Sequence, residues 1–326
     1  MSRGEGSRAV VAGAAGFVGT ALVADLREQG YDVVTVGRAA SGPSHVSWGD
    51  AAGLDRAIDG AAVVINLAGK NVSCRYTARN RREILHSRTA TTSAIARSIA
   101  ASVSPPPVWI NASTATIYRH AMDRPMTESA GEIGTGFSVD VATAWERAFF
   151  QPALPQTRRV ALRMAIVLGD GSALAPLLGL SRVGLGGRQY DGRWWAPRSK
   201  RLAGAFHEYR PTHGRQMFSW VHLDDVLAIV RRSIADDAVS GPINVAAPRP
   251  VDNAELMATV RRVVRMPVGV PLRRWMIELG AIGMRTESEL LLKSRWVVPE
   301  TLTALGYTFR HAELEGAVRA VVEGRS

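Results

Sequence analysis

Cysteine is nearly missing from this sequence, because Cys74 is the only one among 326 residues. A single thiol cannot form an intrachain disulfide, and it cannot supply a thiolate zinc cluster. We therefore expect no metal site, and the reducing cytoplasm as the location. The first seven residues also lack the apolar stretch that is typical of a signal peptide.

Lysine is almost as rare, since 37 of the 40 basic residues are arginine and only Lys70, Lys200 and Lys293 are lysine. The formal net charge of +11 is typical of nucleic-acid-binding proteins, but the arginines are spread along the chain instead of forming one stripe. No apolar run reaches about 18 residues, the length that crosses a bilayer. We therefore expect neither nucleic acid nor a membrane as a partner.

A glycine-rich turn near the beginning of the chain is the main positive feature. An apolar run at 8–12 precedes three regularly spaced glycines, a helical pattern follows them, and a second apolar run at 31–36 completes a βαβ unit. Glycines let the backbone approach a pyrophosphate while the helix N-terminus faces it. A purely structural turn is the alternative. The arrangement predicts a dinucleotide site made by Gly13, Gly16, Phe17, Val18 and Gly19.

The end of the second apolar run bears on the choice between NAD and NADP. An acidic residue there would bond the ribose 2′-hydroxyl of NAD, whereas an arginine suits the 2′-phosphate of NADP. Arg38 stands at this point with no acid beside it, so we expect NADP in preference to NAD. A solvated loop arginine is the alternative. Asp50, after a short run at 45–48, is expected at the adenine edge of the same site.

The next two predicted strands end in small and polar residues. The run at 62–67 is apolar until Asn66, as strands buried on both faces are. The run at 108–112 ends in a cluster of hydroxyls, which can donate a proton to a carbonyl but also form turns. Because open α/β sheets bind ligands at these strand ends, the first run predicts cofactor contacts from Asn66, Leu67, Ala68 and Gly69. The second predicts the catalytic residues Thr114, Tyr118 and Ser113.

The alternation of strands and helices stops after a sixth predicted strand at 159–168. Residues 188–215 are rich in glycine, arginine and aromatic residues, and they are too long for an ordinary loop. Three interpretations stay open, namely a lid over a pocket, a disordered excursion, or a site for a polyanion. Regular structure resumes with a strand at 217–221, and 248–326 has helical patterns interrupted by prolines.

Taken together, these motifs resemble the extended short-chain dehydrogenase/reductase superfamily, of the NAD-dependent epimerase/dehydratase kind. The glycine turn and the segments 66–69, 113–118 and 162–163 carry that resemblance. Further segments are similar to the narrower YfcH-type epimerase-family proteins, namely 87–88, 218–222, 241–248, 270–272, 294–299 and 305–309.

The resemblance implies an α/β fold, with a Rossmann-like doubly wound parallel sheet at 8–247 into which the segment 188–215 is inserted. It also implies a small, mainly helical C-terminal substrate domain at 248–326. Arg163 is expected in the cofactor site on the same grounds. Superfamily members often pair through two helices, so a homodimer is a possible assembly.

One departure from the superfamily matters for function. Its enzymes carry a Tyr-x-x-x-Lys motif, in which the tyrosine is the acid/base and the lysine lowers its pKa and holds the nicotinamide ribose. The matching positions here are Phe137 and Val141, which can carry neither a proton nor a charge. Two functions therefore stay open. One is an oxidoreductase or nucleotide-sugar-epimerase-like enzyme with an atypical acid/base and an unknown small substrate, and the other is a non-catalytic NADP(H)-binding sensor or scaffold.

Overall fold

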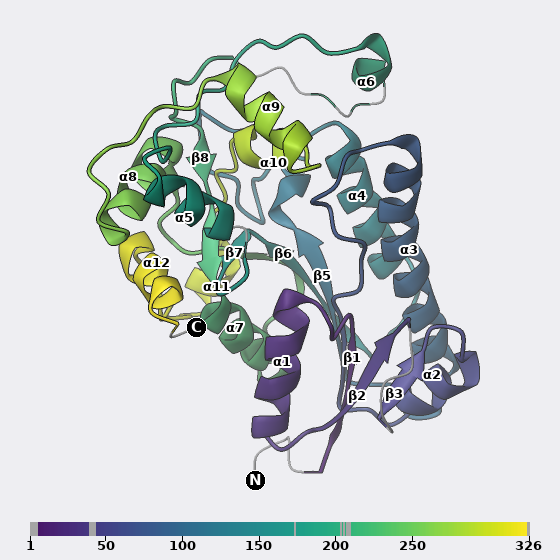
Figure 1. Cartoon of the computed structure of the whole chain (residues 1–326). Helices are drawn as coiled ribbons and strands as arrows, with labels where there is room; N and C mark the ends of the chain where they lie inside the picture. The colour runs from purple at the N-terminus through teal and green to yellow at the C-terminus, as the bar shows by residue number, and fades with distance from the viewer. Residues whose placement is uncertain are drawn as a thin grey trace.

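A seven-stranded parallel sheet forms the centre of the molecule. The computed structural model describes residues 6–38, 44–172, 174–202, 204, 206 and 210–324. The strand order of the sheet is β10-β6-β5-β4-β1-β2-β3 (Figure 1). This confirms the predicted doubly wound sheet, and its order reverses between β1 and β4, where such sheets bind ligands. The strands are β1 (Arg8–Ala12), β2 (Asp32–Gly37), β3 (His45–Ser47), β4 (Val63–Asn66), β5 (Val108–Thr114), β6 (Arg158–Met164) and β10 (Gly241–Val245).

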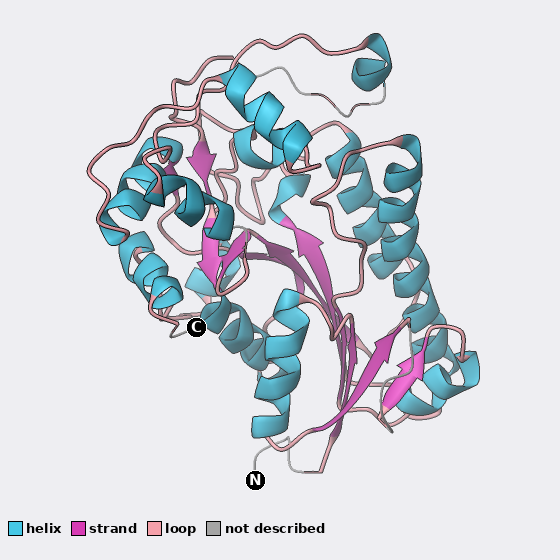
Figure 2. Cartoon of the chain, viewed as in Figure 1, coloured by secondary structure: helices cyan, strands magenta, loops and turns pink. Residues whose placement is uncertain are grey.

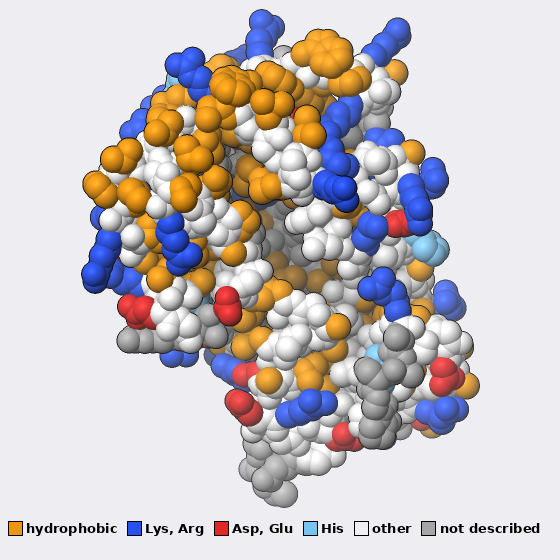
Figure 3. Space-filling model, viewed as in Figure 1, with side chains coloured by type: hydrophobic (Ala, Val, Ile, Leu, Met, Phe, Trp, Pro, Cys, Tyr) orange, Lys and Arg blue, Asp and Glu red, His pale blue; other side chains and the backbone are white. Residues whose placement is uncertain are grey.

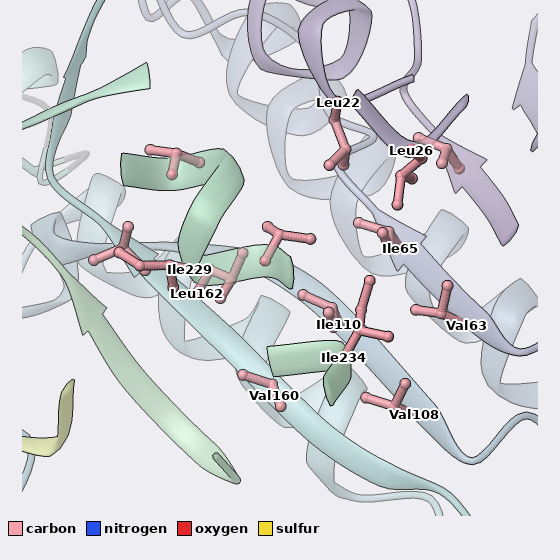
Figure 4. Packing of buried hydrophobic residues seen from close by; sticks show 14 of the residues in the cluster. Leu22, Leu26, Val63, Ile65, Val108, Ile110, Val160, Leu162, Ile229 and Ile234 are labelled. Atoms are coloured by element: carbon pink, nitrogen blue, oxygen red, sulfur yellow. The ribbon is translucent and has the colours of Figure 1, made fainter. Parts of the chain in front are cut away.

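Helices cover both faces of this sheet (Figure 2). Strand β4 shows why the sheet needs a cover on both faces, because successive strand residues point in opposite directions and all four of its residues are buried. Val63 and Ile65 belong to the same buried cluster as Leu22 (Figure 4), whereas Val64 packs in the opposite cluster. One face carries α1 (Phe17–Glu28) and α7 (Leu223–Ala235), and the other carries α2 (Ala51–Ile58), α3 (Ala78–Ala101) and α4 (Phe137–Phe150).

The strand predicted at 159–168 is in fact two strands with different partners. β6 ends at Met164, and β7 (Ile166–Leu168) pairs in parallel with β9 (Trp220–His222) outside the main sheet. The backbone carbonyl of Ser219 accepts a hydrogen bond from Ile166, which draws the chain away from β10. The predicted strand at 217–221 is likewise divided, since β8 (Met217–Phe218) pairs with β11 (Val251–Asp252). Hydrophobic periodicity cannot show such a change of partner.

The C-terminal part is mainly helical, as predicted, and it shares its core with the sheet. Leu302 is completely buried in the same cluster as Val160 of β6 and Ile243 of β10. The proposed boundary between 247 and 248 stays a prediction. The remaining helices are η1 (Ala115–Ile117), α5 (Leu174–Arg182), α6 (Arg198–Leu202), α8 (Asn253–Val263), α9 (Arg274–Gly283), α10 (Glu289–Leu292), α11 (Glu300–Ala304) and α12 (Leu314–Val322).

We expect Leu302→Ala to lower the free energy of unfolding of the whole chain by about 2–5 kcal/mol, because it leaves a cavity beneath the sheet. Val103→Ala is the matched control, since that side chain is 91% exposed and its loss should change stability by less than about 0.5 kcal/mol. Urea unfolding followed by circular dichroism measures both. A variant whose sheet keeps its stability while the C-terminal part unfolds separately would contradict the shared core.

Candidate functional site

The turn after β1 needs glycine at two of its three glycine positions. Gly13 has a φ of +82°, and a Cβ added to it would lie 2.6 Å from the carbonyl carbon of Leu67. A Cβ on Gly19 would lie 2.3 Å from the carbonyl oxygen of Gly13. Gly16 is less constrained, because its φ is −80° and its added Cβ would meet an ordinary contact at 3.4 Å. The turn therefore brings the start of α1 close to the end of β4.

The N-terminus of α1 lies at the ligand-binding edge of the sheet. Its N-cap residue, Gly16, offers no side chain to the first N–H groups of the helix, so these remain available to an anion. Val18 packs against the main core, whereas the ring of Phe17 lies beside Gly169, after β7. The predicted dinucleotide contacts from Gly13 to Gly19 thus fall together at one place in the structure.

Asn66 shapes the turn after β4 from inside the protein. Its Nδ2 donates to Asn111 Oδ1 at 2.7 Å and to Thr92 Oγ1 at 3.1 Å, and its Oδ1 accepts from the backbone N of Ala68 at 3.0 Å. The side chain is completely buried. It therefore fixes the backbone at 67–69, of which Leu67 is half-buried and Gly69 is exposed.

A half-buried arginine, Arg88, lies directly behind this turn. Arg88 Nη1 donates to the carbonyl of Lys70 at 3.0 Å, and a Cβ on Gly69 would lie 3.1 Å from Arg88 Cζ. On its other side the guanidinium lies 5.0 Å from the ring of Trp145, and Ser87 Oγ accepts from the Lys70 backbone N. Burial lowers the pKa of Arg88 to about 10. The sequence singled out residues 87–88 only as a family motif, without a role.

The two residues predicted for the adenosine half of the cofactor lie at the surface. Arg38 follows β2, is exposed, and makes no hydrogen bond or ion pair to any residue that the structure describes. Asp50 is the N-cap of α2, where its Oδ1 accepts from the backbone N of Gly53 at 2.8 Å. The cofactor contacts of both residues stay predictions.

The predicted catalytic hydroxyls are not equivalent. Thr114 ends β5, is half-buried, and its Oγ1 accepts from the backbone N of Thr116 at 3.1 Å, which leaves its proton available. Ser113 is buried and donates to Glu146 Oε1 at 2.6 Å. Of the three predicted catalytic hydroxyls, that of Thr114 alone has a proton without a partner among the described residues, since Tyr118 donates to Asn244.

Arg163 is the centre of a buried hydrogen-bonded chain. It forms two parallel bonds to Glu146, with Nε–Oε1 at 2.8 Å and Nη2–Oε2 at 2.7 Å, and its Nη1 donates to the Tyr118 hydroxyl at 2.8 Å. That hydroxyl donates to Asn244 Oδ1 at 2.9 Å, and Glu128 accepts from the Asn244 backbone N. We call this chain the Arg163 network, and its members are Ser113, Tyr118, Glu128, Glu146, Arg163 and Asn244.

The electrostatics of this network keep both Arg163 and Tyr118 protonated. Burial alone would lower the pKa of Arg163, but its bonds to Glu146 outweigh burial and raise it. Burial raises the pKa of Tyr118, against the opposing effect of Arg163. The Tyr118 side chain is only 1% exposed. The cofactor role of Arg163 and the catalytic roles of Ser113 and Tyr118 stay predictions, because all their contacts described above lie within the protein.

An apolar cluster occupies the positions of the missing Tyr–Lys pair. Phe137 begins α4 and packs edge-on against Tyr76, with ring centroids 5.0 Å apart and an interplanar angle of 69°. Val141, one turn later, is buried in the same cluster. Burial, followed by the charge of Glu289, raises the pKa of Tyr76 to about 12, while a hydrogen bond with Ser138 opposes the change. A different tyrosine thus stands beside the expected position, and no sequence spacing indicated it.

The C-terminal part contributes a buried lysine to the same edge. Lys293 is 4% exposed, and its Nζ donates to the carbonyl of Thr116 at 2.7 Å, in η1 directly after Thr114. Burial and then Arg295 lower the pKa of Lys293 to about 8, with Glu289 opposing them. The sequence signal that could have identified Lys293 is the scarcity of lysine, because only three lysines occur in this arginine-rich chain.

The segment 188–215 is anchored at its base and reaches toward α4. Asp191 is buried and accepts from the backbone N of Thr212 at 2.7 Å, which ties the two ends of the segment together. Near its tip, the carbonyl of Gly204 accepts from the backbone N of Phe137 at 3.0 Å. This position suits a lid, which stays a prediction. Outside the described residues lie positions 203, 205 and 207–209.

His222 joins a second polar cluster, with Asp224 and His311. The two imidazole rings have centroids 3.8 Å apart and planes tilted by 33°. His311 Nε2 lies 3.0 Å from Asp224 Oδ2, and His222 Nδ1 accepts from the Asp224 backbone N at 3.2 Å. One ligand atom from each of these three residues lies within 4.8 Å of the others, so the expected absence of a metal site stays a prediction. Burial and the charge of His311 lower the pKa of His222 to about 4, so it is neutral at neutral pH. The cluster connects α7 to the C-terminal tail.

Comparison with known proteins gives matches along nearly the whole chain. The model of the NAD dependent epimerase/dehydratase family matches residues 9–136, and that of a domain of unknown function (DUF1731) matches residues 274–321. Epimerase family protein SDR39U1 from Bos taurus is 30% identical over 322 residues, covering 97% of this chain and 99% of the relative. Epimerase family protein YfhF from Bacillus subtilis is 27% identical over 321 residues, covering 96% and 97%.

A solved structure agrees with this assignment. The crystal structure of human SDR39U1 (isoform 2) with NADPH superposes with a TM-score of 0.82 at 28% identity, covering 97% of this chain and 99% of the human chain. In this chain, no helix among the described residues is long and apolar enough to cross a membrane.

We expect Gly13→Ala to be much more damaging than Gly16→Ala. Gly13→Ala places a Cβ at a positive φ against the backbone of Leu67, directly after β4, and should cost on the order of 1–3 kcal/mol of stability. Gly16→Ala should cost less than about 1 kcal/mol. Thermal unfolding and titration with NADPH measure both effects. Equal losses for the two variants would show that the close approach of Gly13 to Leu67 is not the constraint.

The stability contribution of Lys293 should depend on pH. Its pKa is depressed in the folded chain, so the unfolded chain binds more protons between about pH 8 and the ordinary value of 10.5. Stability relative to Lys293→Met should therefore rise by up to about 3 kcal/mol across this window and stay flat below it. Urea unfolding of both proteins at a series of pH values measures the difference. A constant difference from pH 7 to pH 11 would contradict the depressed pKa.

Proposed function

The chain belongs to the epimerase family of SDR39U1 and YfhF, and from this membership we propose that it binds NADP(H) and catalyses oxidoreduction of a small carbonyl or alcohol substrate. The observation that carries the proposal is the close approach of Gly13 to both Leu67 and Gly19. It places the open N-terminus of α1 at the point where the strand order reverses. The single cysteine favours a cytoplasmic location.

NADP(H) is the proposed cofactor for two reasons. The human relative was crystallised with NADPH, and its structure aligns with 97% of this chain. Arg38 offers a planar, exposed guanidinium at the end of β2, where the ribose phosphate is expected. The N-terminus of α1 would hold the pyrophosphate, and the backbone at 67–69 would line the path toward the nicotinamide.

We assign the proton chemistry to Thr114 and Tyr76. When bound, the nicotinamide supplies or accepts the hydride. The Thr114 hydroxyl can bond the substrate oxygen from the end of β5. Tyr76 keeps its proton at neutral pH and can give it to that oxygen as the hydride reaches the carbon, so that a carbonyl becomes an alcohol. The resulting phenolate faces the positive charge of Arg88 and regains a proton from water.

A non-catalytic NADP(H) sensor is the second candidate. Phe137 and Val141 close the usual acid/base position with a packed apolar cluster, which favours binding without turnover. Measuring NADPH turnover distinguishes the two candidates, because only the enzyme oxidises NADPH when small carbonyl compounds are added. Binding of NADPH with no turnover across a broad panel of aldehydes and ketones would select the sensor.

Cofactor choice should depend on Arg38. We expect NADPH to bind more tightly than NADH by about 1–3 kcal/mol, because the contact with the 2′-phosphate is charge-assisted. Arg38→Asp should reverse the order by repelling the phosphate. Arg82→Asp is the matched control, since Arg82 is an exposed arginine on α3, away from β2. Fluorescence titration with both cofactors decides the matter, and equal affinities in the unmodified chain would refute the assignment.

The acid/base assignment predicts two separable losses of activity. Thr114→Ala and Tyr76→Phe should each lower kcat on the order of 10²-fold, the usual contribution of a positioned proton donor, with little change in the Kd for NADPH. Thr114→Ser keeps a hydroxyl and should retain most of the activity. Steady-state kinetics on the best substrate of the panel tests these expectations. Undiminished kcat in Tyr76→Phe would remove that residue from the chemistry and leave the cofactor assignment intact.

A further inference from the structure

Helix α9 presents apolar side chains to solvent and buries its charges. Arg274 and Glu278 form an ion pair 2.7 Å long, and each of these two side chains is only 8% exposed. Ser288 Oγ and the carbonyl of Gly192 complete their hydrogen bonds inside the protein. Ile277 and Ala281 are buried on the same side, so α9 is apolar on both faces, whereas a surface helix ordinarily places charged residues outward. The outward face of α9 consists of Trp275, Leu279 and Ile282, which are 50%, 56% and 58% exposed.

Neighbouring segments continue this surface. The backbone N of Val270 donates to the Gly184 carbonyl at 2.8 Å, which joins the loop before α9 to the end of α5. Figure 3 shows the resulting patch over α5, α8 and α9, where hydrophobic side chains gather. Contiguous apolar surface of this kind marks an interaction site. We call it the apolar face, and its members are Val183, Val268, Val270, Trp275, Leu279, Ile282 and Met284, all 47% or more exposed.

The exposed charges that flank the members of the apolar face in the sequence are basic. Exposed arginines flank its members in the sequence, namely Arg182, Arg265, Arg273 and Arg285. Among the described residues of 178–206 and 261–285, the acidic residues are Asp191 and Glu278, and both are buried. The surface is therefore apolar in the middle and basic at its margin. Its complement must offer both hydrocarbon and negative charge.

We propose that the apolar face docks on the surface of an anionic lipid bilayer. Trp275, Leu279 and Ile282 enter the boundary between headgroups and acyl chains, and the surrounding arginines contact lipid phosphates. A second copy of the chain is a poorer complement, because a symmetric contact would bring the same arginines face to face. The sequence analysis predicts no membrane partner, because no apolar run is long enough to span a bilayer, but a helix that lies flat needs no spanning segment.

Vesicle binding by the full chain tests this proposal directly. We expect sedimentation with vesicles of phosphatidylglycerol and phosphatidylcholine in equal parts, little with phosphatidylcholine alone, and a loss of binding at high salt. Tryptophan fluorescence should shift to the blue as Trp275 enters the bilayer. Equal affinity for both kinds of vesicle, or none for either, would overturn the proposal. The test is independent of the proposed oxidoreductase activity.

Two sets of variants separate the apolar and the basic contributions. Leu279→Gln with Ile282→Gln should weaken vesicle binding at least tenfold, because two aliphatic contacts with the bilayer are lost. Arg182→Gln and Arg273→Gln should weaken it about fivefold each. The matched control is Val103→Gln with Ile133→Gln, two exposed apolar residues at 91% and 50% that lie outside the apolar face, and it should bind like the unmodified chain.

Size-exclusion chromatography with light scattering accompanies these measurements and shows whether each variant stays folded and in which assembly. If Leu279→Gln with Ile282→Gln dissociates a dimer without changing vesicle binding, the apolar face is a contact between copies of the chain. That result would overturn the membrane proposal.

Discussion

The guanidinium of Arg163, buried at the carboxyl edge of the sheet, constrains most of what surrounds it. It joins β6 to α4 through Glu146, to the segment after β5 through Tyr118, and through Tyr118 to Asn244 on β10. Removing any one partner would leave a buried charge or polar group without compensation, so the network acts as a unit. Thr114 lies one residue beyond Ser113, a member of this network. Its position is thus set by buried groups that themselves need no contact with a substrate.

The sequence predicts structure best at positions where only one residue type satisfies the local geometry. Gly13 and Gly19 make close backbone approaches that only glycine permits, and their contacts with a dinucleotide stay predictions. The buried parallel strands followed from their continuous apolar runs. Asn66 is an amide at a strand end, but its side chain turns inward to Asn111 and Thr92, so its contact with the cofactor stays a prediction. Burial of a polar residue depends on which donors and acceptors the neighbouring strands bring, and one strand does not reveal its neighbours.

The remaining site residues depended on contacts between distant segments. Tyr76 reaches Phe137 from the loop after β4, and Lys293 reaches Thr116 from the far end of the chain. Neither pairing leaves a periodic signal. Helix α9 illustrates the same limit. Its apolar residues can be read from the sequence, but the sequence does not show which of them face solvent. Its ion pair is buried because Gly192 and Ser288 supply hydrogen bonds there.

The segment around residues 294–298 runs through the sheet-bearing part of the molecule like an additional strand. Ser219 Oγ donates to the carbonyl of Arg295 and accepts from the backbone N of Val297, while Met126 exchanges backbone bonds with residues 296 and 298. During synthesis these partners leave the ribosome long after the strands that need them. Ser219 and Met126 therefore keep unpaired polar groups during synthesis until the segment around residues 294–298 has emerged and can pack against them.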